Sequence, residues 1–75
     1  MITDNMRLDA FLRHIRQDVP VLLFDLASKD NSKRLYPDAS TARCELESEG
    51  VEGCVIHWEY KVLMLRYEIA WVPVL

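Results

Sequence analysis

Apolar and polar residues alternate along two successive runs near the C-terminus, 53–60 and 62–72, and no other feature constrains the fold as strongly. A period of two is typical of β-strands that bury one face. The polar positions are odd-numbered up to Lys61 and even-numbered from Arg66. Because a change of phase turns the later side chains to the other face, a turn or bulge must lie between the runs, near Lys61. The pattern therefore predicts two antiparallel strands.

The N-terminal part of the chain has the pattern of an amphipathic helix. Four apolar residues recur at helical spacing on one face: Leu8, Phe11, Leu12 and Ile15. Thr3 or Asp4 is suited to cap the start of this helix, and Pro20 lies beyond its end. We therefore predict a helix over about residues 5–17.

The next segment predicts a hairpin. Residues 19–27 form a nearly continuous apolar run, which favours a buried strand. Residues 28–33 are all polar and rich in Asp, Asn and Ser, as in turns. We expect the chain to return as a short strand over residues 33–36, which Pro37 ends.

Residues 38–49 are compatible with two structures. A helix is favoured by Asp38 as a cap, by Gly50 at the end and by the low β-propensity of Ala and Glu. Against it, Glu47 and Glu49 would place negative charge in the last turn, where it opposes the helix dipole. Apolar and polar residues also alternate here as they would in a strand. We favour the helix.

The predicted order is α-β-β-α-β-β, a small single α+β domain over residues 1–75, with an antiparallel sheet and the helices packed on one face. A domain this small buries only about 60% of its unfolded surface, and many such domains gain stability from a partner chain. The two cysteines allow one disulfide at most. Because no apolar signal segment follows Met1, we expect free thiols in a cytoplasmic protein.

The charge is distributed unevenly. The whole chain carries −3, but residues 38–53 carry five acidic side chains against one arginine. An acidic block of this kind either faces a basic protein surface or forms a solvated face. An acidic chain is also a poor general binder of nucleic acid, whose affinity for proteins comes chiefly from Lys and Arg.

No motif indicates catalysis, a metal or a cofactor. The ligand-type residues His14, Cys44, Cys54 and His57 lack the spacing of a metal site. On a regular strand Cys54 and His57 would point to opposite faces, so they would not form a nucleophilic pair. With only two glycines the chain has no Gly-rich phosphate cradle. We expect a protein that is not an enzyme and holds no cofactor or metal.

The C-terminal third contains more large apolar side chains than two short helices can cover. We expect five of them to lie on the face away from the helices: Val55, Val62, Met64, Ala70 and Val72. Exposed apolar area of this kind usually marks an interface.

These features predict a non-catalytic binding protein that acts by protein–protein contact and forms a homodimer. We expect an inhibitor or adaptor that occludes a larger partner, as do many small proteins encoded by viruses and mobile elements. The predicted contact residues are three acidic side chains and both tryptophans: Glu45, Glu49, Glu52, Trp58 and Trp71.

The alternative is a small nucleic-acid-associated protein. Its contacts would come from the first helix and the loop near residue 30: Arg13, Arg16, Lys29, Lys33 and Arg34. The negative net charge makes this alternative the weaker one. No apolar run is long enough to span a membrane, so we expect no membrane partner.

Overall fold

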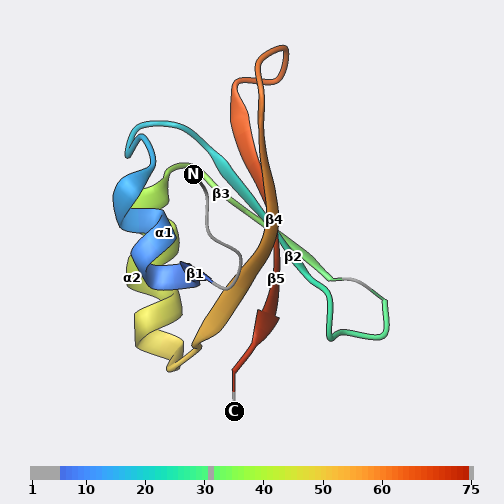
Figure 1. Cartoon of the computed structure of the whole chain (residues 1–75). Helices are drawn as coiled ribbons and strands as arrows, with labels where there is room; N and C mark the ends of the chain where they lie inside the picture. The colour runs from blue at the N-terminus through green and yellow to red at the C-terminus, as the bar shows by residue number, and fades with distance from the viewer. Residues whose placement is uncertain (1–5, 31, 75) are drawn as a thin grey trace.

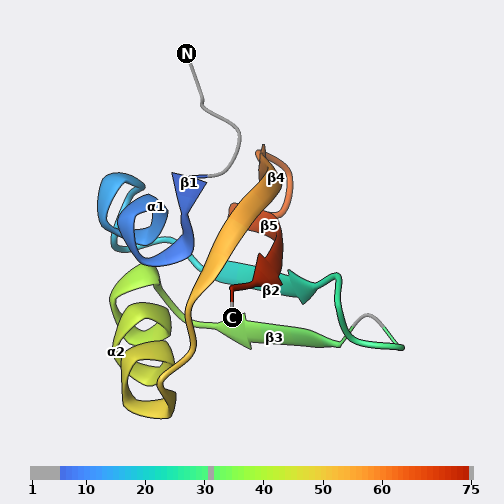
Figure 2. The same cartoon turned by 60° about the horizontal axis from the view of Figure 1, so that its bottom comes forward.

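The computed structural model describes residues 6–30 and 32–74. In this part of the chain, two helices cover one face of a five-stranded sheet (Figures 1 and 2). In chain order the elements are β1 Met6–Arg7, α1 Leu8–His14, β2 Val21–Asp25, β3 Lys33–Tyr36, α2 Ala39–Glu49, β4 Gly53–Lys61 and β5 Arg66–Pro73. The prediction of a small α+β domain is confirmed. The order differs from the predicted one, because the short strand β1 precedes α1.

The sheet is mixed, with the strand order β1-β4-β5-β2-β3. β2 lies parallel to β5, with Val21 opposite Tyr67 and Asp25 opposite Trp71, whereas the other neighbouring strands are antiparallel. The predicted antiparallel sheet is therefore wrong at this pair. The alternation of apolar and polar residues along a strand shows which face of the strand is buried. The same alternation occurs whether the neighbouring strand is parallel or antiparallel, so it does not predict the direction. The direction of β5 relative to β2 depends on the connection through α2, which carries the chain from β3 at one edge of the sheet back to β4.

α1 is shorter than the predicted helix over residues 5–17. Arg7 occupies the N-cap position without a capping side-chain hydrogen bond, and the predicted caps Thr3 and Asp4 lie outside the described residues. At the other end Ile15 is already extended. The Gln17 amide donates hydrogen bonds to the carbonyl oxygens of Leu12 (2.8 Å) and Ile15 (2.7 Å), replacing the bonds of a further turn.

The apolar face predicted for this helix is confirmed at three positions. The buried residues of α1 are Leu8, Phe11 and Leu12. They pack with the inner side of the sheet, where the largest fully buried side chains include Val21, Leu23 and Ile69.

α2 confirms the helical alternative for residues 38–49. The Asp38 carboxylate accepts a hydrogen bond from the backbone N–H of Thr41 at 2.6 Å. Gly50 follows the helix in the left-handed conformation, with φ 72°. The apolar stripe is thin but buried: Ala39, Ala42 and Leu46. The two terminal signals therefore outweigh the unfavourable glutamates of the last turn.

A β-bulge changes the phase of β4. Val55 lies opposite Trp71, but the next paired residue is His57, opposite Ala70. Ile56 is the extra residue, and its side chain is 47% exposed, whereas Val55 is only 3% exposed. The expectation that Val55 lies on the face away from the helices is therefore wrong, because the bulge shifts the alternation by one residue.

Gly53 is required by the packing of β4 on β5. A Cβ atom at this position would overlap the Trp71 ring and lie 2.8 Å from the carbonyl oxygen of Val72. We expect Gly53→Ala to lower the free energy of unfolding by about 1–3 kcal/mol, because a buried ring or the backbone must move. Urea denaturation measures this change. Cys54→Ala at the next position is the control and costs less; a Gly53→Ala variant as stable as the wild type would contradict the packing.

The cap of α2 predicts a pH dependence. The backbone N–H of Thr41, and then its side chain, hold the pKa of Asp38 below the ordinary value of 3.8. Because the folded-state pKa is lowered, the contribution of Asp38 to stability is complete above pH 3.8 and is lost as the pH falls through the lower folded-state pKa.

We therefore expect Asp38→Ala to be less stable than the wild type at pH 7, with a difference that shrinks at pH 2. Asp38→Asn, which keeps the oxygen acceptor without the charge, is expected to lose less. Urea titrations of all three proteins at both pH values measure the effect. A difference between wild type and Asp38→Ala that is independent of pH would contradict this role of the carboxylate.

Candidate interaction surface

The turn between β4 and β5 presents four consecutive apolar side chains to solvent. We call residues 62–65 the hairpin tip; it comprises Val62, Leu63, Met64 and Leu65. Leu63 is 100% exposed and the other three are 60–67% exposed. The hairpin projects beyond the helices at one end of the molecule (Figure 1), so no other described element covers the tip.

The turn itself is hydrogen-bonded. The N–H of Met64 donates to the carbonyl of Lys61 at 3.1 Å, and the N–H of Leu65 donates to that of Val62 at 3.3 Å. Leu65 has φ 53° and is the only described non-glycine residue with a positive φ. A left-handed conformation costs an L-residue roughly 1–2 kcal/mol, and Gly or Asn usually occupies such a position. A bulky leucine there is unfavourable for the turn, and because Leu65 is 62% exposed it gains little burial in compensation.

Four charged residues form a collar below the tip on the sheet face opposite the helices. Lys61 pairs with Glu59 at 3.0 Å, and Arg66 pairs with Glu68 at 2.7 Å. Lys61, and then His57 at 3.2 Å, lower the pKa of the Glu59 carboxyl. Since each cation has its own carboxylate, the collar carries no net charge from these four groups.

A row of aromatic side chains supports the hairpin on the helix side. Tyr60 packs on Tyr67 (ring centroids 5.1 Å apart), Tyr67 on Trp58 (6.1 Å), and Trp58 on Phe11 of α1 (5.3 Å). Tilted contacts of this kind stabilise beyond the area they bury. The row therefore connects the projecting hairpin to the core.

An open hollow lies at the side of the tip. Its lining combines the apolar side chains of the turn with charged groups of the collar: Tyr60, Lys61, Val62, Leu63, Met64 and Glu68. An apolar surface bordered by charged groups is the usual composition of a protein interface.

Two of the three acidic residues predicted to contact a partner, Glu49 and Glu52, form ion pairs within the chain. The Glu49 carboxylate receives two hydrogen bonds from Arg34, at 3.0 and 2.7 Å, which hold the pKa of Glu49 below its usual range. Glu52 pairs with Arg7 at 3.1 Å. Glu45 is exposed on α2 without an ion pair within the described part of the chain.

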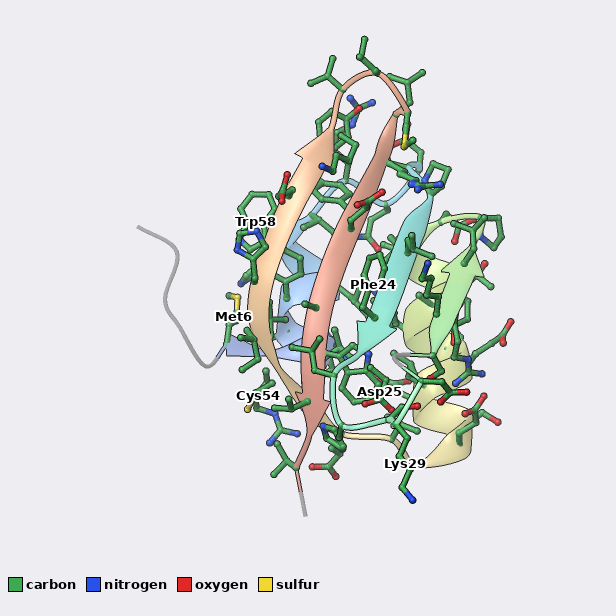
Figure 3. The ribbon with its side chains drawn as sticks, turned by 90° about the vertical axis from the view of Figure 1, so that its right-hand side faces the viewer. Met6, Phe24, Asp25, Lys29, Cys54 and Trp58 are labelled. Carbon is green, nitrogen blue, oxygen red and sulfur yellow. The ribbon has the colours of Figure 1, made fainter. Side chains whose placement is uncertain are left out.

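The two tryptophans lie in different environments. Trp71 is only 5% exposed and belongs to the hydrophobic core, so it offers a partner no accessible surface. Trp58 is half-buried and packs against the core from the edge of the sheet (Figure 3). Of the predicted pair, only Trp58 retains accessible area.

Three of the five basic residues of the nucleic-acid alternative pair with carboxylates of the chain. Arg13 pairs with Glu47 at 3.3 Å, Arg16 pairs with Asp18 at 3.4 Å, and Arg34 is held by Glu49. Lys33 lies 5.8 Å from the ring centre of Phe24, and Lys29 is exposed in the loop after β2 (Figure 3). Arg34 belongs to the predicted nucleic-acid surface and Glu49 to the predicted acidic contact surface. Because these two residues form an ion pair, reversing either charge would disturb both surfaces.

The bulge in β4 also changes the relation between Cys54 and His57. Cys54 lies opposite Val72 and His57 opposite Ala70, so both side chains are on the same face and not on opposite faces as expected. Both cysteines are free thiols. Among residues 6–30 and 32–74, no three His, Cys, Asp or Glu side chains are grouped closely enough to hold a metal ion. No helix in these ranges has the length and apolar composition needed to cross a membrane.

Comparison of the chain with models of known families, with curated proteins and with solved structures finds no match.

The sequence pattern does not predict the hairpin tip, although it predicts that Val62 and Met64 lie away from the helices. The alternation predicts that residues 62–65 belong to the second strand, whereas β5 begins at Arg66. The signal was present: four apolar residues stand where the change of phase requires a turn. Turns are usually polar, so an apolar turn indicates a surface with another purpose.

The conformation of Leu65 gives a stability prediction. We expect Leu65→Asn to raise the free energy of unfolding by up to about 1 kcal/mol, because Asn adopts the left-handed conformation at lower cost. Thermal or urea unfolding measures the gain, and Leu63→Asn is the control for the loss of an exposed leucine. Equal stabilities for both variants would contradict strain at Leu65.

Proposed function

We propose that this chain is a non-catalytic binding protein that uses the hairpin tip to dock onto an apolar site of a larger protein. The observation that carries the proposal is the run of four solvent-exposed apolar side chains at a strained turn. Exposed apolar groups are unfavourable in water, and their burial by a partner is worth about 25 cal/mol per Å². Backbone strain retained in an exposed turn is likewise typical of functional segments.

The surroundings of the tip suit a protein partner. Each cation of the collar is paired with a carboxylate, which leaves little attraction for the phosphates of nucleic acid or of a lipid surface. The aromatic row holds the hairpin in position before binding, so little conformational entropy is lost on docking. Occlusion of a partner's apolar site is the mode of action expected of an inhibitor or adaptor.

The test compares capture by three forms of the protein. Wild type, Leu63→Ser and Leu35→Ser are immobilised and exposed to an extract of the native host; Leu35 is a matched control, because it is an exposed leucine on β3, away from the tip. We expect a protein that wild type and Leu35→Ser retain and that Leu63→Ser loses.

The captured protein is then purified and titrated against all three forms. Loss of one buried leucine is expected to weaken its binding about tenfold or more for Leu63→Ser only. Equal affinities for Leu63→Ser and the wild type would overturn the proposed role of the tip. Tight, salt-sensitive binding of single-stranded or duplex nucleic acid by the wild type would favour the alternative function instead.

A further inference from the structure

Within the part of the chain that the structure describes, one side of β4 has a neighbouring strand over only a short part of its length. We call the side of residues 57–61 that faces away from β5 the outer edge of β4. β1 pairs with β4 only through Met6 opposite Val55 and Arg7 opposite Cys54. Beyond these pairs, no strand among the described residues lies against the outer edge (Figure 3). An unpaired edge of this length is a template for another strand.

The hydrogen bonds of β5 define which backbone groups of β4 point outward. The N–H of Tyr67 donates to the carbonyl of Pro20, and the carbonyl of Trp71 accepts from the N–H of Leu26. The odd-numbered residues of β5 therefore direct their backbone groups toward β2, and the even-numbered residues direct theirs toward β4.

The register between β4 and β5 shows which backbone groups of β4 point to its outer edge. Glu59 lies opposite Glu68, so its backbone groups point toward β5. Tyr60 lies opposite Tyr67 and Trp58 lies opposite Ile69. The N–H and C=O groups of Trp58 and Tyr60 consequently point outward, away from β5.

We propose that a second copy of this chain pairs with the outer edge of β4, in an antiparallel two-fold arrangement centred on Tyr60. The backbone groups of Tyr60 meet those of Tyr60 of the partner subunit across the axis. Glu59 then lies opposite Lys61 of the partner subunit, and by symmetry Lys61 lies opposite the partner's Glu59. Two cross-strand ion pairs form on one face of the joined sheets.

Neighbouring registers are less favourable. A two-fold axis at Glu59 places Glu59 opposite Glu59 of the partner subunit, and like charges directly opposite are destabilising. An axis at Trp58 extends the pairing to Val55, whose outer side is occupied by Met6. Of these three registers, only the one centred on Tyr60 combines outward backbone groups, opposite charges and an edge that no described strand occupies.

Charge variants test the register. Sedimentation velocity at high micromolar concentration is expected to show a dimer for the wild type. In a dimer of Glu59→Lys, or in one of Lys61→Glu, like charges lie opposite each other at two places. We expect the dissociation constant of each of these dimers to be about tenfold larger than that of the wild type, or more.

The decisive experiment mixes the two single variants. In the mixed pair every opposing position again carries opposite charges, so we expect a heterodimer to form. Each chain has lost its own ion pair between residues 59 and 61, so repair of that pair within a chain cannot explain the recovery. Leu63 lies in the turn, outside residues 59–61, which pair with the same residues of the partner subunit. Leu63→Ser leaves those backbone groups and charges in place, so we expect this variant to remain dimeric. This variant separates the dimer from the proposed docking function.

Three results would overturn the proposal. A monomeric wild type at high micromolar concentration would show that the outer edge does not pair with a second copy. A mixture that recovers no dimer would rule out the Tyr60 register. Dissociation by Leu63→Ser, with no effect of the charge variants, would assign self-association to the hairpin tip.

Discussion

The parallel pairing of β2 with β5 is the contact on which the rest of the structure depends. It joins two hairpins, β2–β3 and β4–β5, that would be only marginally stable if isolated. It also brings Val21, Leu23 and Ile69 together at the centre of the sheet, where each is at most 1% exposed. The two helices cover this centre from one side, and the projecting hairpin is the part of β4 and β5 that they do not reach.

Three ion pairs among the described residues connect elements that are distant in the sequence. Arg34 of β3 holds Glu49 at the end of α2, and Arg7 before α1 reaches Glu52 before β4. Exposed pairs of this kind contribute little to stability individually. They do, however, engage charges that would otherwise form separate acidic and basic surfaces. The feature of the described surface that is most unfavourable in water is therefore apolar, and it is the hairpin tip.

Much of the fold could be predicted from local signals. The apolar face of α1, the two ends of α2 and the strand β3 follow from side-chain periodicity and terminal residues, and each depends on neighbours in the sequence. The candidate surface was predicted only in part. The excess of exposed apolar side chains near the C-terminus was expected, but Trp71 was assigned to it and is buried. The local sequence pattern around a tryptophan in an alternating strand is the same whether the residue lies in the core or at an interface.

The sequence by itself determined the two helices and the strands β2, β3, β4 and β5, although not all their ends, and that the apolar residues are concentrated in the last third. These properties depend on composition and period along the chain. Only the tertiary structure decided the direction of β2 relative to β5, the bulge at Ile56 that turns Val55 inward, and the exposure of residues 62–65. Each of these depends on contacts between residues far apart in the chain. The position of β5 beside β2 decides which edge and which turn the other described elements leave uncovered. The alternation of residues along a single strand does not specify that position.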